Sequence, residues 1–256
     1  MSLLGRIIHL AAPVPQVEAY ERYLFLGPHP DDIEVGAGAT AAKLAAAGKQ
    51  VCVLVCTDGR YGLENALEGT TPQALIELRQ AEARASAAAL GVEDVRFLPF
   101  SDGGFYGFED LVKAAARIVG EVKPQVILAP DPDVISECHV DHKNAGEVAK
   151  RLAFFAPFPE IMARYGAQPA DVQALAFFMT ARPNRFVGTR GLLARQLSSL
   201  LCHRTQFPPA SEAFKSVALY LKLRSLSFGL RSLKGRAEGF RVLGKTHMHC
   251  LPEAGE

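Results

Sequence analysis

Short apolar runs alternate with helical stretches over the first two thirds of the chain. The runs cover residues 22–27, 50–56, 95–98 and 125–129. The run at 50–56 is continuously apolar, as parallel strands covered on both faces are. The stretches between and after them have Ala-rich or amphipathic sequence typical of helices and cover residues 35–48, 71–90, 110–121 and 144–155. The helix at 71–90 also has matching boundary residues, because Thr71 can cap its start, Pro72 suits its first turn and Gly91 suits its end.

This alternation predicts an α/β fold: a Rossmann-like, doubly wound and mostly parallel sheet with helices on both faces. The pattern loosens beyond Pro157. There we expect a further strand at 172–179 and two basic helices at 185–202 and 211–226.

We expect a single domain over residues 1–256, because no stretch of the chain is long enough to be a linker between two domains. Its core is expected at about 22–181, followed by a basic C-terminal helical extension at about 182–245. The first fifteen residues faintly resemble a signal peptide. Their apolar stretch is short and is interrupted by Arg6 and His9, so we predict an N-terminal helix.

A G-x-G-x-x-A pattern at residues 36–41 fits the dinucleotide-binding fingerprint. In that fingerprint the glycine turn follows its strand at once, whereas Gly36 comes nine positions after Gly27. We therefore interpret these small residues as a means for a helix to pack closely against its neighbours.

Composition narrows the class of protein. Hydrophobic residues make up 49% and charged residues 21% of the chain, which excludes a disordered or fibrous protein. Apolar runs stay shorter than the ~18 residues of a membrane-spanning helix, which excludes stable membrane insertion. The five cysteines are odd in number and have no paired spacing, which indicates a reducing compartment and predicts a cytoplasmic protein.

The net charge of +1 hides an uneven distribution. Residues 182–245 contain 13 Lys and Arg against only Glu212 and Glu238, whereas residues 1–181 contain 15 basic and 23 acidic residues. A basic C-terminal quarter is suited to an anionic part of a substrate, to peripheral contact with a phospholipid surface, or to pairing with acidic parts of the same chain or another subunit. We expect no nucleic-acid partner.

Segments rich in Asp and His follow three of the predicted strands: PHPDD at 28–32, TDG at 57–59, and PDPD at 130–133 leading to CHVDH at 138–142. The carboxyl ends of parallel strands meet at one edge of a sheet, where such folds bind ligands. Carboxylates gathered there repel one another unless a cation or hydrogen bonds compensate. A divalent metal ion is the simplest compensation.

The spacing of these residues suits a metal site. His29 and Asp32 lie three positions apart in a turn stiffened by Pro30, and His139 and His142 are also three apart. Two histidines and one carboxylate leave a coordination position for water, a set that suits catalytic zinc and also Fe(II). Asp31 can then accept a proton from the activated water, and the remaining histidine can stabilise an oxyanion or protonate a leaving amine.

The sequence resembles the LmbE-like (PIG-L type) N-acetylglucosaminyl deacetylases over roughly residues 22–245. The two metal motifs together make the resemblance specific. The matching segments are PHPDD at 28–32 followed by IEVGAG, TDG at 57–59, R-x-x-E at 79–82, SDG at 101–103, HVDH at 139–142 and H-x-x-Q at 203–206.

The resemblance implies a role for each residue of the two motifs. It makes His29, Asp32 and His142 the zinc ligands and Asp31 the general base. It assigns His139 to the tetrahedral intermediate, as oxyanion stabiliser or acid. Asp141 is expected to orient a histidine as part of the catalytic group. The implied reaction is hydrolysis of an acetamide on a GlcNAc-containing conjugate.

The chain departs from the family pattern near the expected substrate mouth. Many relatives carry an acidic residue after the Thr-x-Gly turn, where this chain has Arg60 followed by Tyr61. We expect Arg60, Arg79 and Asp102 to bind substrate; a helix-surface arginine and a turn aspartate are the alternative interpretation of the last two. Cys138 is expected to be a small buried residue, with a redox-sensitive thiol as the alternative.

We therefore predict a cytoplasmic zinc-dependent N-deacetylase acting on a small amino-sugar substrate, with Fe²⁺ as the other candidate metal. The resemblance also implies a homo-oligomer. One alternative is a metal-dependent amidase acting on a different N-acyl small molecule or glycopeptide. Another is a non-catalytic sugar- or phospholipid-binding module.

Overall fold

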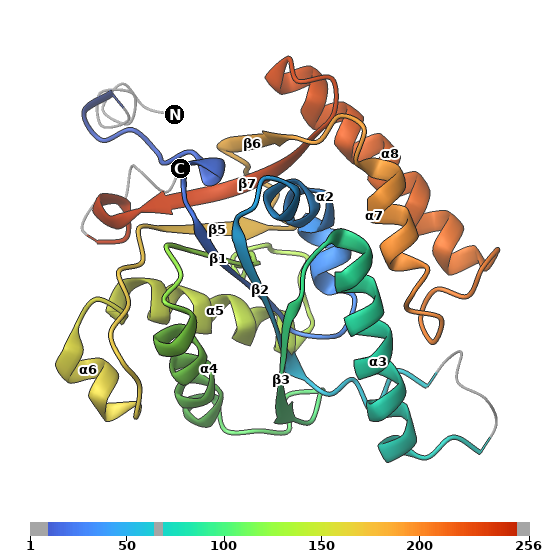
Figure 1. The fold of residues 1–256 in the computed structure, drawn as a ribbon, viewed down its shortest axis with the longest axis horizontal. Coiled ribbons are helices and arrows are strands. Elements are labelled where there is room, and N and C mark those ends of the chain that lie inside the picture. Colours follow the sequence, from blue (N-terminus) through green and yellow to red (C-terminus); the bar gives the residue numbers. More distant parts are fainter. Residues whose placement is uncertain (1–9, 64–68, 250–256) are drawn as a thin grey trace.

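A seven-stranded sheet with the order β3-β2-β1-β4-β5-β7-β6 forms the centre of the molecule (Figure 1). The computed structural model describes residues 10–63 and 69–249. The strands are β1 (Arg22–Gly27), β2 (Gln50–Thr57), β3 (Asp94–Phe100), β4 (Val126–Pro130), β5 (Ala174–Phe178), β6 (Arg185–Gly188) and β7 (Ala237–Gly244). The first five pair in parallel, which confirms the predicted doubly wound, mostly parallel sheet.

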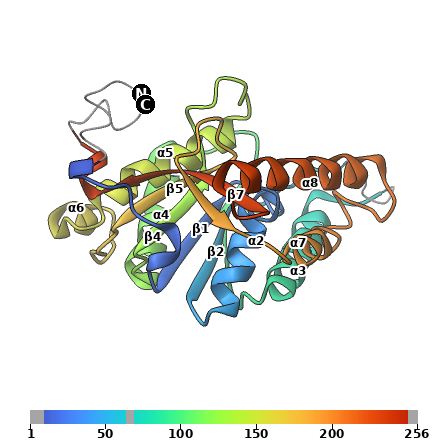
Figure 2. The ribbon, with the colours of Figure 1, turned by 90° about the horizontal axis from the view of Figure 1, so that it is seen from above.

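Helices cover both faces of the sheet, as Figures 1 and 2 show. One face carries α2 (Asp32–Ala46), α3 (Pro72–Leu90), α7 (Leu193–Leu200) and α8 (Glu212–Ser232). The other carries α4 (Phe108–Val122), α5 (Val140–Phe155) and the short α6 (Pro159–Arg164). Alternate residues of each strand enter separate cores, with Phe25 in one and Leu24 and Leu26 in the other. Both faces of the central strands β1, β2, β4 and β5 are buried, which is why these strands are almost continuously apolar.

The C-terminal part differs from its prediction. The segment 185–202, expected as one basic helix, contains the strand β6 and only then the helix α7. β6 pairs with the antiparallel strand β7, which the sequence pattern did not indicate. The interpretation as a helix was wrong because the partner that makes β6 a strand lies about fifty residues further along the chain. α8 matches the second predicted helix and continues to Ser232.

Most of the predicted N-terminal helix falls on residues 1–9, which lie outside the described residues. Within the described part, residues 12–16 are irregular and are followed by the short 3-10 helix η1 (Val17–Ala19). A second 3-10 helix, η2 (Lys245–His247), follows β7. Among the described residues, no helix is long and apolar enough to cross a membrane.

The strand order reverses between β1 and β4, and folds of this kind bind their ligands beyond the carboxyl ends of the strands at such a point. Close packing of α2 on the sheet holds one wall of this edge in place. A Cβ atom at Gly36 would lie 2.2 Å from the Phe178 ring, so glycine is required there. The small residues at 36–41 therefore serve helix packing, as their distance from the preceding strand indicated.

Candidate active site

Both sequence motifs lie at the starts of helices, at the edge where the strand order reverses. His29 follows β1 directly, and α2 begins at Asp32, three residues earlier than predicted. Likewise α5 begins at Val140, four residues before the predicted start, with His139 as its N-cap residue. The two motifs, more than a hundred residues apart in sequence, therefore come together beyond β1 and β4.

The three predicted metal ligands lie close together in the fold. The ligand atoms of His29, Asp32 and His142 all lie within 4.8 Å of one another. His29 Nδ1 is 3.0 Å from Asp32 Oδ2, and His142 Nε2 is 3.3 Å from Asp32 Oδ1. Their side chains are only 10–15% exposed. Two imidazole nitrogens and a carboxylate at such spacing form the ligand set of a catalytic divalent metal with open positions.

Each of the two histidines also has a carboxylate at its other ring nitrogen. Asp141 Oδ2 is hydrogen-bonded to His29 Nε2 at 3.1 Å. Glu137 Oε2 lies 3.0 Å from His142 Nδ1 as a nearby charge, but without the geometry of a hydrogen bond. Metal-binding histidines are held in this way because the outer carboxylate fixes the tautomer and the ring orientation. Glu137 was missed in the sequence, although it stands just before the second motif.

Asp141 is itself held by several donors. It accepts hydrogen bonds from the Gly103 and Gly104 amides, at 2.6 and 2.9 Å, and from the Tyr106 hydroxyl at 2.8 Å. Burial alone would raise its pKa, but the hydrogen bonds from His29, Tyr106 and Gly103 lower the pKa of Asp141 to about 2. Asp141 therefore stays ionised and anchors the 103–106 turn to His29. Tyr106 has no spacing signal in the sequence that connects it with the site.

His139 lies beside the metal set rather than in it. Its ring packs edge-on against His29, with ring centroids 4.6 Å apart, and its side chain is 47% exposed. Its Nδ1 is 3.8 Å from Asp141 Oδ2, further than His29 is from the same oxygen. The exposed ring is thus available to a ligand that enters from solvent. The atoms of His29, His139 and Asp141 form a second possible metal grouping, in which His139 is the exposed member.

Asp31 occupies a strained position next to the metal set. Its φ of 113° lies in the left-handed region, which costs energy for a residue with a side chain. Arg79 Nη2 lies 3.4 Å from Asp31 Oδ2 and donates to the Pro30 carbonyl at 2.9 Å. Burial and the neighbouring Asp32 raise the pKa of Asp31 to about 6, against the opposing effect of Arg79. A carboxyl group whose pKa lies close to pH 7 is suited to accept and release a proton.

The three predicted substrate-binding residues have different surroundings. The Arg60 guanidinium binds Asp58 through Nε and Nη2, at 3.0 and 2.5 Å from Oδ2, and its side chain is 35% exposed. Arg79 is 3% exposed, so it is not a helix-surface residue; it also donates to the Gly59 carbonyl at 2.9 Å. Asp102 accepts from the Tyr61 amide at 3.3 Å through Oδ2. Its buried Oδ1 has no hydrogen-bond partner among the described residues.

Two exposed aromatic rings stand next to Asp102. Tyr61 and Phe105 are 58% and 74% exposed and meet edge to face with their centroids 6.1 Å apart. Tyr61 directly precedes Gly62, and Phe105 belongs to the turn that Asp141 anchors. The sequence did not predict a binding role for either ring.

A buried polar group lies on the α3 side of the site. His203 is fully buried, and its Nε2 lies 3.4 Å from Glu34 Oε1 without a hydrogen bond. Glu34 Oε1 accepts a hydrogen bond from the Ser86 hydroxyl at 2.7 Å. Glu82 accepts from the amide and hydroxyl of Thr205. The R-x-x-E and H-x-x-Q segments of the sequence therefore meet in the structure, and they fix α3 to the segment after α7.

Cys138 does not match its prediction. We expected a small buried residue, but the Cys138 side chain is exposed and its thiol donates weakly to the Ser136 carbonyl at 3.7 Å. The error arises because Cys138 lies in the irregular segment before α5, where side chains do not face the core.

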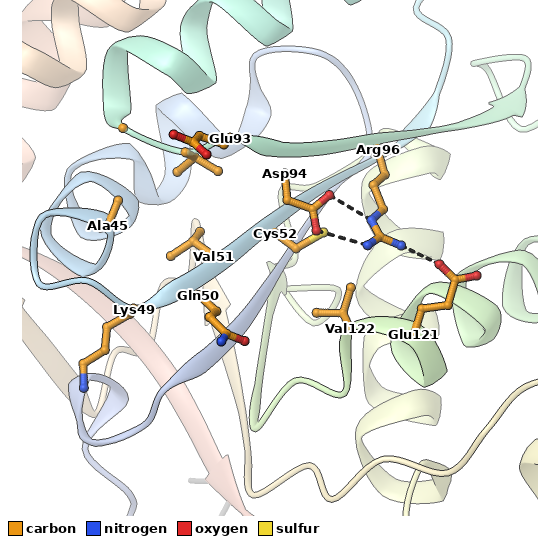
Figure 3. A pocket seen from close by; sticks show the side chains of 12 residues that line it. Ala45, Lys49, Gln50, Val51, Cys52, Glu93, Asp94, Arg96, Glu121 and Val122 are labelled. Atoms are coloured by element: carbon orange, nitrogen blue, oxygen red, sulfur yellow. Dashed lines mark hydrogen bonds and ion pairs between the residues drawn. The ribbon is translucent and has the colours of Figure 1, made fainter.

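A second charged cluster lies at the opposite edge of the sheet, at the amino ends of β2 and β3. It lines a pocket of about 470 Å³ that contains Cys52, Asp94, Arg96 and Glu121 (Figure 3). Arg96 donates to Asp94 at 2.9 and 3.1 Å and to Glu121 at 2.6 Å. Asp94 and Glu121 thus have the same arginine as their partner, and the lining of this pocket contains no histidine.

The chain was compared with protein families and with known proteins. The family described as GlcNAc-PI de-N-acetylase (PIG-L) matches residues 24–153. The diacetylchitobiose deacetylase of Thermococcus kodakarensis is 30% identical over 239 residues, which is 91% of this chain and 87% of that protein. The 1D-myo-inositol 2-acetamido-2-deoxy-alpha-D-glucopyranoside deacetylase of Streptomyces avermitilis is 36% identical over 63% of this chain and 62% of its own.

Among solved structures, the N,N'-diacetylchitobiose deacetylase of Pyrococcus horikoshii in complex with an inhibitor has a TM-score of 0.86 to this chain. It is 25% identical in sequence, and the match covers 98% of this chain and 97% of that one. The similarity therefore includes β6, β7 and α8, which lie beyond the residues matched by the family.

Proposed function

This chain belongs to the GlcNAc-PI de-N-acetylase (PIG-L) family, and on that premise we propose that it removes the N-acetyl group from a GlcNAc-containing sugar or sugar conjugate by metal-dependent hydrolysis. The observation that carries this proposal is the convergence of His29, Asp32 and His142 beside Asp31. Relatives that act on diacetylchitobiose and on a GlcNAc-inositol conjugate support the substrate class.

Zinc is the proposed metal, held by His29, Asp32 and His142. The donor set fits because two nitrogens and one carboxylate oxygen converge in a largely buried place with outer carboxylates on both histidines. When bound, the ion polarises the amide carbonyl and lowers the pKa of the attacking water. Fe(II) uses the same ligand types, and metal analysis of the purified protein distinguishes the two ions.

We assign the proton transfers to two side chains. Asp31 takes a proton from the water that attacks the acetamide carbon, and the tetrahedral intermediate then expels the amine as the C–N bond breaks. His139, exposed and adjacent to the metal set, stabilises the oxyanion or protonates the leaving nitrogen. The products are acetate and the free amino sugar. Asp141 contributes by orienting His29 rather than by touching the substrate.

Substrate binding is assigned from the contacts around Asp102. Its buried and unpartnered Oδ1 is suited to accept a hydrogen bond from a sugar hydroxyl. The exposed rings of Tyr61 and Phe105 provide an apolar surface for the next sugar ring or the aglycone. Arg60 is paired with Asp58 but half-exposed, so it can also reach an anionic group. Arg79 is too buried for the direct sugar contact we expected, and we assign it to holding Asp31.

The decisive experiment combines metal analysis with acetate release from a panel of N-acetyl sugars: GlcNAc, diacetylchitobiose and a GlcNAc-inositol conjugate. We expect about one metal ion per chain and acetate from at least one of these. Bound metal without acetate from any of them would favour an amidase for a different N-acyl molecule or glycopeptide. If the protein does not bind metal and does not release acetate, the result would favour a non-catalytic binding module.

The cytoplasmic location and the homo-oligomer stay predictions. Light scattering of the purified protein tests the second, and fractionation of the native host cell tests the first.

A further inference from the structure

The outer face of α8 carries a row of exposed leucines. Leu219, Leu223, Leu226, Leu230 and Leu233 are 57%, 59%, 41%, 66% and 96% exposed. The first four follow one another at intervals of four, three and four residues, so at 100° per residue they lie within an arc of about 60° on the helix surface. Leu233 is the C-cap residue, with a left-handed φ of 57°, and lies just beyond the helix end. We call these five residues the leucine stripe. An exposed apolar row of this kind marks a surface that binds a partner.

The stripe is not needed to hold α8 on the domain. The opposite face of the helix already packs on the core through Ala218, Leu221 and Phe228, all buried. Arg224 adds a hydrogen bond to the Thr180 carbonyl at 3.1 Å. α8 therefore has two apolar faces, of which the protein covers one. Figure 2 shows the helix running along the outside of the molecule.

The charges next to the stripe are almost all positive. Lys222 lies on one side of it, and Lys234 lies just beyond the helix end. Arg231 lies on the other side, where its guanidinium stacks over the Phe186 ring at 5.2 Å from the centroid. Among the described residues, no acidic group lies within 4 Å of the Lys222 or Lys234 amino groups. The single acid of α8, Glu212, is already paired with Lys215 at 2.7 Å. A partner for this face must therefore be apolar in its middle and anionic at its margins.

A second copy of the same helix does not meet this requirement. Leucines at intervals of four and three also form the seam of a coiled coil, but stable seams extend over three or four heptads and carry paired opposite charges at their flanks. Here the stripe spans two heptads, and its flanks offer lysine and arginine without acids to pair with. Two stripes packed together would bring these like charges near one another.

We propose that α8 is a docking helix for an anionic phospholipid surface. The leucine stripe enters the boundary between headgroups and acyl chains, while Lys222 and Lys234 contact lipid phosphates, as in amphipathic helices that lie in the membrane plane. The contact is peripheral, because α8 lies along the surface and does not cross it. Apolar burial and charge attraction both contribute to the binding energy.

Docking through α8 brings the candidate active site close to the lipid surface. Arg224 of α8 binds the Thr180 carbonyl, and the Thr180 hydroxyl donates to Asp131 at 2.6 Å. Asp131 begins the segment that leads to His139, so α8 adjoins the same sheet edge that carries the metal residues. The proposal concerns the surface alone and does not depend on the activity assigned to that edge.

The test is sedimentation of the whole protein with vesicles of phosphatidylcholine containing phosphatidylglycerol, and with vesicles of phosphatidylcholine alone. We expect the protein to bind the anionic vesicles, more weakly as salt rises through ~0.1 M, and to bind the neutral ones little. The double variant Leu223→Glu/Leu226→Glu should lose about tenfold or more in vesicle affinity, because it places two negative charges in the apolar stripe. Leu78→Glu, a single Leu→Glu exchange at a 47% exposed position of α3, should bind like the wild type.

Lys222→Glu separates the electrostatic part of the binding from the apolar part. It should weaken binding to the anionic vesicles and flatten the salt dependence, while thermal melting stays unchanged. The proposal is overturned if the wild type does not sediment with anionic vesicles, or if the double variant sediments as well as the wild type. It is also overturned if the wild type binds no vesicles and light scattering shows an oligomer that the double variant breaks, since the stripe is then a self-association face.

Discussion

The two ends of the parallel strands both gather charged side chains, but they compensate those charges differently. At the amino ends of β2 and β3, Arg96 binds both Asp94 and Glu121, and this arginine lowers the pKa of Asp94 (Figure 3). At the carboxyl ends of β1 and β4, Asp32 and Asp141 face histidines instead of lysine or arginine among the described residues. In the Arg96 cluster the arginine compensates the acids directly. The cluster at the carboxyl ends of β1 and β4 instead has the ligand atoms of a metal site.

The same distinction separates acids that are neighbours at the site edge. Asp131 and Asp133, which the sequence placed in the acidic cluster, are both bound by Arg241, at 2.5 and 2.7 Å. Asp58 is bound by Arg60. The number of acids at the strand ends therefore exceeds the number that belong to the candidate metal site. The acids that belong to it are those that pair with a histidine instead of an arginine.

The largest expected effect comes from removing a metal ligand. His142→Ala should lose both bound metal and acetate release, because one carboxylate and one histidine hold a divalent ion poorly. Elemental analysis and the acetate assay on the same sample measure this. The matched control is His139→Ala, which should keep its metal while activity falls. An alanine variant at 142 that retained one ion per chain would contradict the ligand assignment.

Removal of the general base should cost less than removal of the ion. Asp31→Asn keeps the size of the side chain and should lower the turnover rate by about 10² to 10⁴, the usual contribution of a general base, with metal content unchanged. Steady-state acetate release gives the rate. Turnover near the wild-type rate would show that another group takes the proton.

A smaller effect is expected when the carboxylate that orients a metal ligand is changed. Asp141→Asn weakens the hydrogen bond to His29 and should reduce metal affinity by about 10- to 100-fold, the range seen for outer-shell carboxylates. Competition with a chelator measures the affinity. Asp131→Asn is the control, since this acid lies at the same edge but binds Arg241. Equal losses in both variants would mean that general charge at this edge, rather than orientation of His29, sets the affinity.

The smallest effect is expected at the opposite edge of the sheet. Glu121→Gln removes one charge from the Arg96 cluster, and because Glu121 is 62% exposed its ion pair should contribute less than about 1 kcal/mol to stability. Activity and metal content should stay at wild-type levels. Denaturant unfolding and the acetate assay test both expectations. A loss of activity in this variant would show that the Arg96 cluster also contributes to the reaction, contrary to the distinction drawn here.

Local sequence predicted the central fold well because its signals are local. The helix α3 begins after Thr71, whose hydroxyl accepts from the Ala74 amide at 3.2 Å, and ends at Gly91, whose φ is 85°. The apolar runs became β1 to β4 within one or two residues of their predicted bounds. Capping and strand burial depend on the residue types at those positions, so the chain carries this information in each segment.

The C-terminal part was predicted less well because its signals are not local. β6 and β7 are strands because they pair with each other and β7 pairs with β5, across long separations in sequence. Likewise Tyr106 and Glu137 join the site only because the turn after β3 and the segment before α5 meet there. No spacing rule along the chain connects such residues.

The sequence by itself determined the elements of the α/β core and the two motifs that supply His29, Asp32 and His142, because turn geometry and residue chemistry are properties of short segments. Only the tertiary structure decided which acids are neutralised by arginine and which face histidine. It also decided that Arg79 is buried against Asp31, and that one apolar face of α8 stays outside. These outcomes depend on which side chains meet across the fold, and hydrogen bonds and ion pairs form only between groups that meet.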